Sequence, residues 1–115
     1  MAKYDAQLDL HFTALGDPTR RMVLARLARG PASVSELAAP HDMALSSFLG
    51  HLKKLEDAGL MVSTKTGRVR VCALSADAFS PAQDWLTTQK AAWNGRLDRL
   101  DDYVATLMKE KNSGP

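Results

Sequence analysis

The sequence predicts a mainly α (α+β) fold in which four amphipathic helices are followed by a β-hairpin and one long helix. Three observations support this fold class. Apolar residues recur at helical spacing through the first half, an alternating β-branched segment follows residue 60, and an apolar helical seam begins after residue 81. A chain of 115 residues has room for one such core but not for two.

The first two helices are predicted from apolar spacing and from end signals. Between residues 4 and 15, steps of four and three residues place three apolar side chains on one helical face, namely Leu8, Phe12 and Leu15. The second helix begins after Asp17, a good N-cap, with Pro18 in its first position, and it stops at Gly30-Pro31. Its inward-facing residues are expected to be Val23, Leu24 and Leu27.

The middle of the chain is predicted to form two helices joined by a tight turn. Ser33 and Glu36 have the spacing of a capping box, and a short third helix follows them. The fourth helix runs from about Ala44 to Ala58 and ends at Gly59, which can adopt the left-handed conformation. The core stripe of this fourth helix is expected to contain Leu45, Phe48, Leu52 and Leu55.

A two-stranded hairpin and a long helix are predicted to complete the fold. β-branched residues recur near period two from Leu60 to Leu74, with Thr66-Gly67 as a turn signal. From Pro81 onward a long helix carries an apolar seam with a repeat close to 3.5 residues. The domain is expected to span residues 1–110, and residues 111–115 are expected to form a disordered tail. The seam contains Leu86, Trp93, Leu97, Leu100, Val104 and Leu107.

A short helix, a tight turn, a second helix and a β-hairpin make a winged helix-turn-helix. The exposed side of the second helix carries small polar residues and then basic ones, and the hairpin adds further cations. Arg68 and Arg70 are expected to point the same way from one strand, with Lys65 across the turn. Such residues suit base edges and phosphates of double-stranded DNA. The predicted DNA-binding residues are Ser46, Ser47, Gly50, Lys53, Lys54, Lys65, Arg68 and Arg70.

A resemblance that extends over nearly the whole chain rests on three segments with a specific order and spacing: FTALGDPTRRMVLARLARGPASVSELA, HLKKLEDAGL and KTGRVRVCAL. Together they resemble the ArsR/SmtB family of small dimeric bacterial transcription regulators. The resemblance implies a winged-helix homodimer that binds a partly palindromic operator, usually as a repressor released by a small effector.

The two metal sites familiar in that family lack their ligands in this chain. The family's metal sensors have cysteines after the residues that match Glu36-Leu37, whereas this sequence has Ala38, Ala39 and Pro40. The other site uses histidine and acidic residues of the final helix, and that helix contains no histidine here. A metal site is therefore not predicted, and no cofactor is predicted.

The recognition helix departs from the pattern of family members without metal sites, which commonly reads Ser-x-His-Leu. His51 and Leu52 match this pattern, whereas Leu49 and Gly50 replace the serine and the residue after it. This difference supports an alternative function, in which the chain is a winged-helix protein-interaction module that does not bind DNA. Gly50 would also permit a closer approach of the helix backbone to the groove. His51 lies at the border of the core stripe and is expected to be packed and hydrogen-bonded there.

The other histidines and the single cysteine carry no recognisable site. His11 and His41 have no Cys or carboxylate at ligand spacing, so solvated or capping roles are expected. Cys72 is expected to be a small apolar residue in a strand. A further alternative is a repressor that responds to an effector. It would do so either through oxidation of Cys72 or through a metal site that the sequence does not reveal. The sequence contains no constellation that predicts catalysis, so an enzyme is not expected.

The apolar seam of the last helix is longer than so few core elements would cover, so a partner helix is predicted to cover it. The alternative is a helix folded back on its own domain. A two-fold dimer would set two recognition helices about one duplex turn apart, which predicts an inverted-repeat operator. The predicted homodimer interface contains Leu8, Phe12, Leu86, Trp93, Leu97, Leu100, Val104 and Leu107.

Composition points to a cytoplasmic protein without a membrane partner. Hydrophobic residues make up 45% of the chain and charged residues 24%, which is ordinary for a folded soluble protein. The one cysteine permits no intrachain disulfide. The N-terminus lacks the pattern of a signal peptide, and no apolar run approaches the ~20 residues that span a bilayer.

Overall fold

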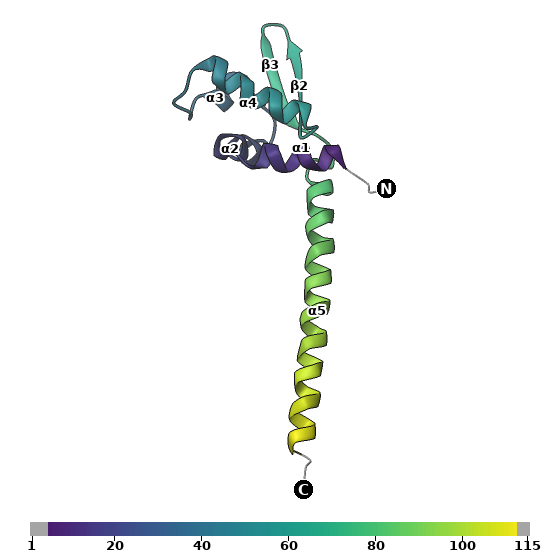
Figure 1. Cartoon of the computed structure of the whole chain (residues 1–115). Coiled ribbons are helices and arrows are strands. Elements are labelled where there is room, and N and C mark those ends of the chain that lie inside the picture. Colours follow the sequence, from purple (N-terminus) through teal and green to yellow (C-terminus); the bar gives the residue numbers. More distant parts are fainter. Residues whose placement is uncertain (1–4, 113–115) are drawn as a thin grey trace. The chain divides into compact units, whose positions relative to one another are not determined.

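The computed structural model describes residues 5–112, apart from the side chain of residue 112. Two compact units divide the chain, one ending at Ala82 and the other beginning at Gln83. A mainly helical first unit with a small antiparallel sheet confirms the predicted winged helix-turn-helix (Figure 1). The elements are α1 (Ala6–Leu15), α2 (Pro18–Leu27), β1 (Ala32–Ser33), α3 (Val34–Ala38), α4 (Leu45–Asp57), β2 (Met61–Thr66), β3 (Val69–Leu74) and α5 (Ser80–Asn112).

The predicted start of α2 is confirmed. The Asp17 carboxylate accepts a hydrogen bond from the Arg20 amide at 3.0 Å, and Pro18 lies in the first turn. That hydrogen bond holds the pKa of Asp17 below its ordinary value. The three residues that α2 was expected to bury are each at most 3% exposed, namely Val23, Leu24 and Leu27.

The face of α1 that the first unit buries is not the apolar face formed by Leu8, Phe12 and Leu15. His11 and Ala14 are the buried residues of this helix, whereas Phe12 is 37% exposed and Leu8 is only partly buried. Since α1 packs against both α2 and α4, the positions of these two helices determine which of its stripes is covered. Tyr4, the first residue of the predicted helix, lies outside the described residues.

Local signals set the ends of α3 and α4 as predicted. Ser33 Oγ accepts a hydrogen bond from the Glu36 amide, and the Glu36 carboxylate accepts one from the Ser33 amide, which completes the capping box. At the end of α4, Gly59 has a φ of +78°. The Leu60 amide there donates to the Leu55 carbonyl at 3.0 Å, as in a Schellman motif.

The sheet contains one strand more than the predicted hairpin. Its order is β1-β3-β2, and β1 pairs antiparallel with β3 through Ala32 and Cys72. In the hairpin, Gly67 and Arg68 form a two-residue loop, with Gly67 at a φ of +63°. The expectation that Arg68 and Arg70 share a strand is therefore wrong, because β3 begins only after Arg68.

The core of the first unit lies where α2, α4 and the sheet meet. Phe48 and Leu55 of α4 and Cys72 of β3 are each at most 1% exposed. Leu45, which was expected in the core stripe, is 59% exposed. Leu45 is the first residue of α4 and lies at the edge of the core, which covers Phe48 three residues later.

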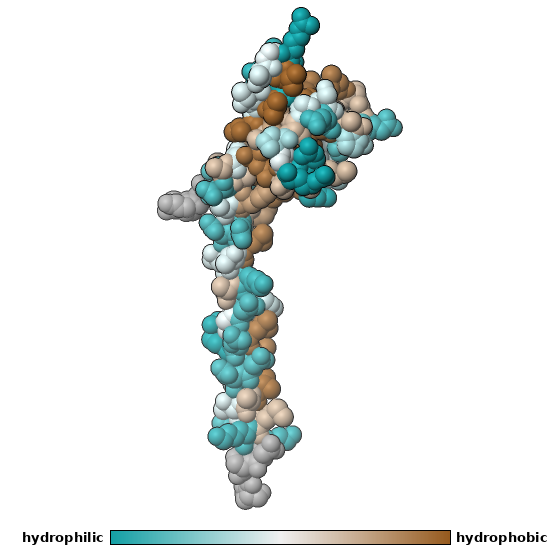
Figure 2. Space-filling view, turned by 180° about the vertical axis from the view of Figure 1, so that it is seen from behind, coloured by the Kyte–Doolittle hydropathy of each residue, from teal (hydrophilic) through white to brown (hydrophobic). Residues whose placement is uncertain are grey.

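The second unit is the remainder of α5. Figure 2 shows apolar side chains along one side of this helix and hydrophilic ones along the other. All six residues of the predicted seam are exposed, from 38% at Leu97 to 57% at Trp93. The helix includes the first two residues of the predicted disordered tail, and residues 113–115 lie outside the described part. None of the described helices is long and apolar enough to cross a membrane.

Candidate nucleic-acid interface

The exposed side of α4 carries the polar and basic residues that the sequence assigned to DNA contact. The helix is fixed from its other side by Phe48, Leu52 and Leu55, which are at most 5% exposed. Burial of these side chains on one side leaves the opposite side available as a rigid surface. The exposed residues there are Ser46, Ser47, Gly50, Lys53 and Lys54.

Lys53 has an acidic neighbour on its own helix. Its Nζ lies 3.3 Å from an Asp57 carboxylate oxygen one turn later, and both side chains are more than half exposed. Exposed pairs of this kind contribute little to stability and are screened by salt. A phosphate group can therefore displace Asp57 as the partner of Lys53 at small cost.

The hairpin places its three cations differently. Lys65 and Arg70 are cross-strand partners, whereas Arg68 occupies the turn. All three are exposed. Arg70 Nη1 donates to Ser63 Oγ at 2.8 Å, and Ser63 Oγ donates to the Glu56 carboxylate at 3.0 Å. This chain of hydrogen bonds ties the wing to α4, so the wing and the recognition helix form one continuous surface.

A buried arginine connects α4 to the first two helices. Arg20 is 7% exposed and donates to the carbonyl oxygens of Ala14 at 2.9 Å and Thr13 at 3.1 Å, both in the last turn of α1. Its Nη1 also lies 3.0 Å from His51 Nδ1 on α4. The Thr13 carbonyl also accepts a hydrogen bond from the Gly16 amide at 3.1 Å. One guanidinium thus adds donors to two carbonyls at the end of α1 and holds α4 against that end through His51.

The contact with Arg20 determines the tautomer of His51. A guanidinium has only donors, so His51 Nδ1 accepts this hydrogen bond and the ring proton lies on Nε2. The 3.6 Å distance from Nδ1 to the Asp17 carboxylate is then no ion pair, because Nδ1 carries no proton. The predicted role of His51 as a packed and hydrogen-bonded border residue is confirmed.

Arg20 was missed by the sequence analysis, although the sequence contains a signal for it. It lies three and four residues before Val23 and Leu24, the spacing of the buried face of α2. A charged residue on a buried face requires partners. Those partners come from α1 and α4, and no local pattern identifies them.

The expectation that His11 is solvated or has a capping role is wrong, whereas His41 is partly exposed. His11 is 1% exposed, and among the described residues neither of its ring nitrogens has a hydrogen-bond partner. His41 packs its ring against Phe48, with 5.3 Å between the ring centroids. The His11 ring is covered by the packing of α1 against other helices, which spacing within one helix does not reveal.

Cys72 is a core residue, as expected from its strand. It is fully buried, and desolvation raises the pKa of its thiol above the ordinary value. The thiolate is the form that reacts with oxidants. Burial therefore disfavours the alternative in which oxidation of Cys72 releases the protein from DNA.

Gly50 lies on the exposed side of α4, and a Cβ atom added there would meet nothing within 4 Å. We expect Gly50→Ala to stabilise the protein by about 1 kcal/mol, because alanine is the better helix former. If the bare backbone serves close approach to the groove, the same variant will bind DNA more weakly. Urea unfolding and mobility shifts of the two proteins check both parts, and unchanged DNA affinity would remove the close-approach explanation.

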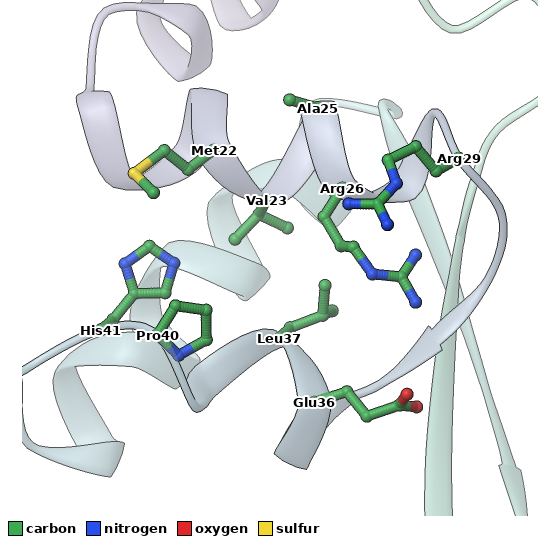
Figure 3. A pocket seen from close by; sticks show the side chains of 9 residues that line it. All are labelled: Met22, Val23, Ala25, Arg26, Arg29, Glu36, Leu37, Pro40 and His41. Carbon is green, nitrogen blue, oxygen red and sulfur yellow. The ribbon is translucent and has the colours of Figure 1, made fainter.

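A pocket of about 400 Å³ lies between α2 and α3 and contains none of the predicted DNA-binding residues. Figure 3 shows Arg26 and Arg29 at one end and Met22 and His41 at the other. Arg26 is engaged with the protein itself, since its Nη1 donates to the Gly30 carbonyl at 3.0 Å. Within residues 5–112 no three His, Cys, Asp or Glu side chains gather as metal ligands.

Comparisons with known proteins agree with this geometry. Residues 15–64 match the model of a helix-turn-helix domain. The HTH-type transcriptional regulator Rv2034 of Mycobacterium tuberculosis is 39% identical over 66 residues. That match spans 57% of this chain and 62% of the regulator, about three fifths of its length.

Solved structures extend the likeness over most of the chain. A crystal structure of an ArsR family transcriptional regulator is 53% identical and has a TM-score of 0.76, over 82% of this chain and 97% of that one. The homodimeric winged helix-turn-helix DNA-binding domain of a possible ArsR-family regulator from Mycobacterium bovis is 21% identical, with a TM-score of 0.59. It covers 80% of this chain and 94% of its own, and it shares the fold.

Proposed function

Because this chain belongs to the ArsR family of winged helix-turn-helix transcriptional regulators, we propose that it binds an inverted-repeat operator as a homodimer and represses transcription. The observation that carries this proposal is the continuous surface of α4 and the wing. One side of α4 is anchored by buried apolar residues, and the other exposes serines, a glycine and lysines next to a basic hairpin.

Each part of this surface suits a different part of the duplex. The serines near the start of α4 can donate or accept hydrogen bonds at base edges in the major groove. Lys53 and Lys54, about two turns later, are suited to phosphates beside that groove. Arg68, at the apex of the wing, is suited to the neighbouring backbone or minor groove. Arg70 stays beside α4 through Ser63 and would support the helix and the wing together.

A dimer is supported by the exposed seam of α5. Six large apolar side chains along one side of a single helix are unusual for a surface that stays in water. A second copy of the same helix would cover the seam by two-fold symmetry and double the DNA-contacting surface. The seam also suits a partner of another sequence, so the oligomeric state is tested separately.

Phosphate contact by Lys53 is tested through salt dependence. We expect Lys53→Ala to weaken binding to all duplexes by a similar factor and to lower the slope of log K against log salt by ~1, because one counterion fewer is released. The measurement is a mobility-shift or fluorescence-anisotropy titration at several salt concentrations. DNA from around the protein's own promoter and an unrelated duplex serve as probes.

Lys111→Ala is a matched control, because Lys111 is an exposed lysine in the last turn of α5. It removes the same charge and should leave the slope unchanged. If Lys53→Ala also leaves the slope unchanged, Lys53 does not contact phosphate. If the wild-type protein shifts neither duplex even at low salt, the proposal of DNA binding fails and a protein-interaction module is favoured.

A further inference from the structure

Two leucines of α4 are exposed although the helix buries its other large apolar residues. Leu45 is 59% and Leu49 is 42% exposed, whereas Phe48, Leu52 and Leu55 are at most 5% exposed. The two leucines are four residues apart, so they lie one above the other on the same side of the helix. They form an apolar strip, defined here as Leu45 and Leu49, beside the serines and lysines of the proposed DNA-binding surface.

The apolar strip forms one wall of a surface hollow between α4 and the wing. The hollow measures about 420 Å³ and is also bounded by residues 33–35 at the start of α3. Val34 and Val69 add two further apolar side chains to it. Two cations, Arg68 and Arg70, line the same hollow. An occupant must therefore offer apolar surface and negative charge side by side. Duplex DNA has both in its major groove, where phosphates border the base edges.

The apolar group on a base edge in the major groove is the C5-methyl group of thymine. We propose that Leu45 and Leu49 read thymine by apolar contact with this methyl group and so determine part of the operator sequence. A leucine side chain offers no hydrogen bond. Cytosine or guanine at the same position would therefore lose the water bound to the polar groups of its major-groove edge and gain no hydrogen bond from the protein in return. This inference rests on the proposed DNA binding and names what the helix recognises.

The test compares thymine with uracil, which presents the same hydrogen-bonding edge and lacks only the methyl group. Duplexes that the wild-type protein selects from a random pool at low salt define the half-site. Each thymine of that half-site is then replaced by deoxyuridine, one position at a time. We expect about fourfold weaker binding at each contacted thymine, the fold-change that corresponds to burial of about one methylene group.

The leucine variants assign this loss to a side chain. In Leu49→Ala or Leu45→Ala, the ratio of the affinities for thymine and uracil should fall toward 1 at the position that the replaced leucine contacts. The preference should persist at the other positions. Both leucines are exposed, so the variants should fold, and thermal unfolding verifies this. Met22→Ala is the matched control, since Met22 is 55% exposed on α2 and should leave the preference intact.

The outcomes separate this inference from the proposed function. If the pool yields no enriched duplex, both proposals fall. If the protein binds the selected duplexes equally well with thymine or uracil at every position, only the proposed reading of thymine is overturned. The same holds if the selected half-site lacks thymine, or if both leucine variants keep the full preference of the wild-type protein.

Discussion

Replacement of Leu97 and Leu100 by aspartate is expected to convert the protein from a dimer to a monomer. Two-fold symmetry makes each substitution act twice. Loss of apolar burial by the leucines, at about 1.5 to 3 kcal/mol each, weakens a dimer by more than about a thousandfold. The introduced carboxylates add a desolvation cost. Sedimentation equilibrium at micromolar concentration measures the change.

Operator binding should fall together with dimerisation. A monomer contacts one half-site, and loss of the linked second contact costs at least about a hundredfold in affinity. Ala91→Asp is the control, because Ala91 is exposed on the side of α5 opposite the seam. It introduces one carboxylate of the same kind and should leave the protein dimeric. A Leu97→Asp/Leu100→Asp protein that stays dimeric would show that the seam is not the interface.

Arg20→Met is expected to destabilise the fold by about 3 kcal/mol. The change keeps most of the side-chain volume but removes the donors for the Thr13 and Ala14 carbonyls and for His51 Nδ1. The Ala14 carbonyl and His51 Nδ1 lose their Arg20 donors, whereas the Thr13 carbonyl keeps the hydrogen bond from the Gly16 amide. The loss of these hydrogen bonds from a charged group accounts for a cost of this order. Urea unfolding at one fixed protein concentration measures it, because dimerisation would make stability depend on concentration.

The neighbouring Arg21 provides the control for the loss of stability expected in Arg20→Met. Arg21 donates to the Leu15 carbonyl at 2.8 Å, but it is exposed. Water can replace its hydrogen bond, so Arg21→Met should cost less than about 1 kcal/mol. The loss of stability in Arg20→Lys should lie between those of Arg20→Met and Arg21→Met. A lysine ammonium group lacks the planar fork of donors with which arginine reaches three acceptors at once. Equal effects of Arg20→Met and Arg21→Met would refute the positioning role of Arg20.

The parts of the fold that sequence predicted well are those whose causes are local. Asp17 caps α2, Ser33 and Glu36 cap α3, and Gly59 ends α4, each through groups within a few residues. Periodicity likewise placed polar and basic residues together on the exposed side of α4. The strand β1 was missed because two residues carry no periodic signal, and its pairing partner Cys72 is 40 positions away.

The errors occurred where two or more elements meet. Leu45 shares the apolar spacing of its helix, yet it lies beside Leu49 at the hollow next to the wing and is 59% exposed. His11 and Arg20 look like surface residues in the sequence, and the packing of α1, α2 and α4 buries both. A helical repeat says which residues share a face, but the neighbours of that face determine its burial.

Sequence alone therefore established the order of the helices and the hairpin, the capped helix ends and the residue types on the exposed side of α4. Hydrogen bonding and periodicity act over short distances along the chain, so local patterns report them. Tertiary packing decided the rest of the site. It brought Arg20 to His51 across 31 residues, joined Arg70 to Glu56 through Ser63, and left Leu45 and Leu49 open beside the wing. The physical reason is that contacts between elements depend on how those elements are placed, which no local pattern encodes.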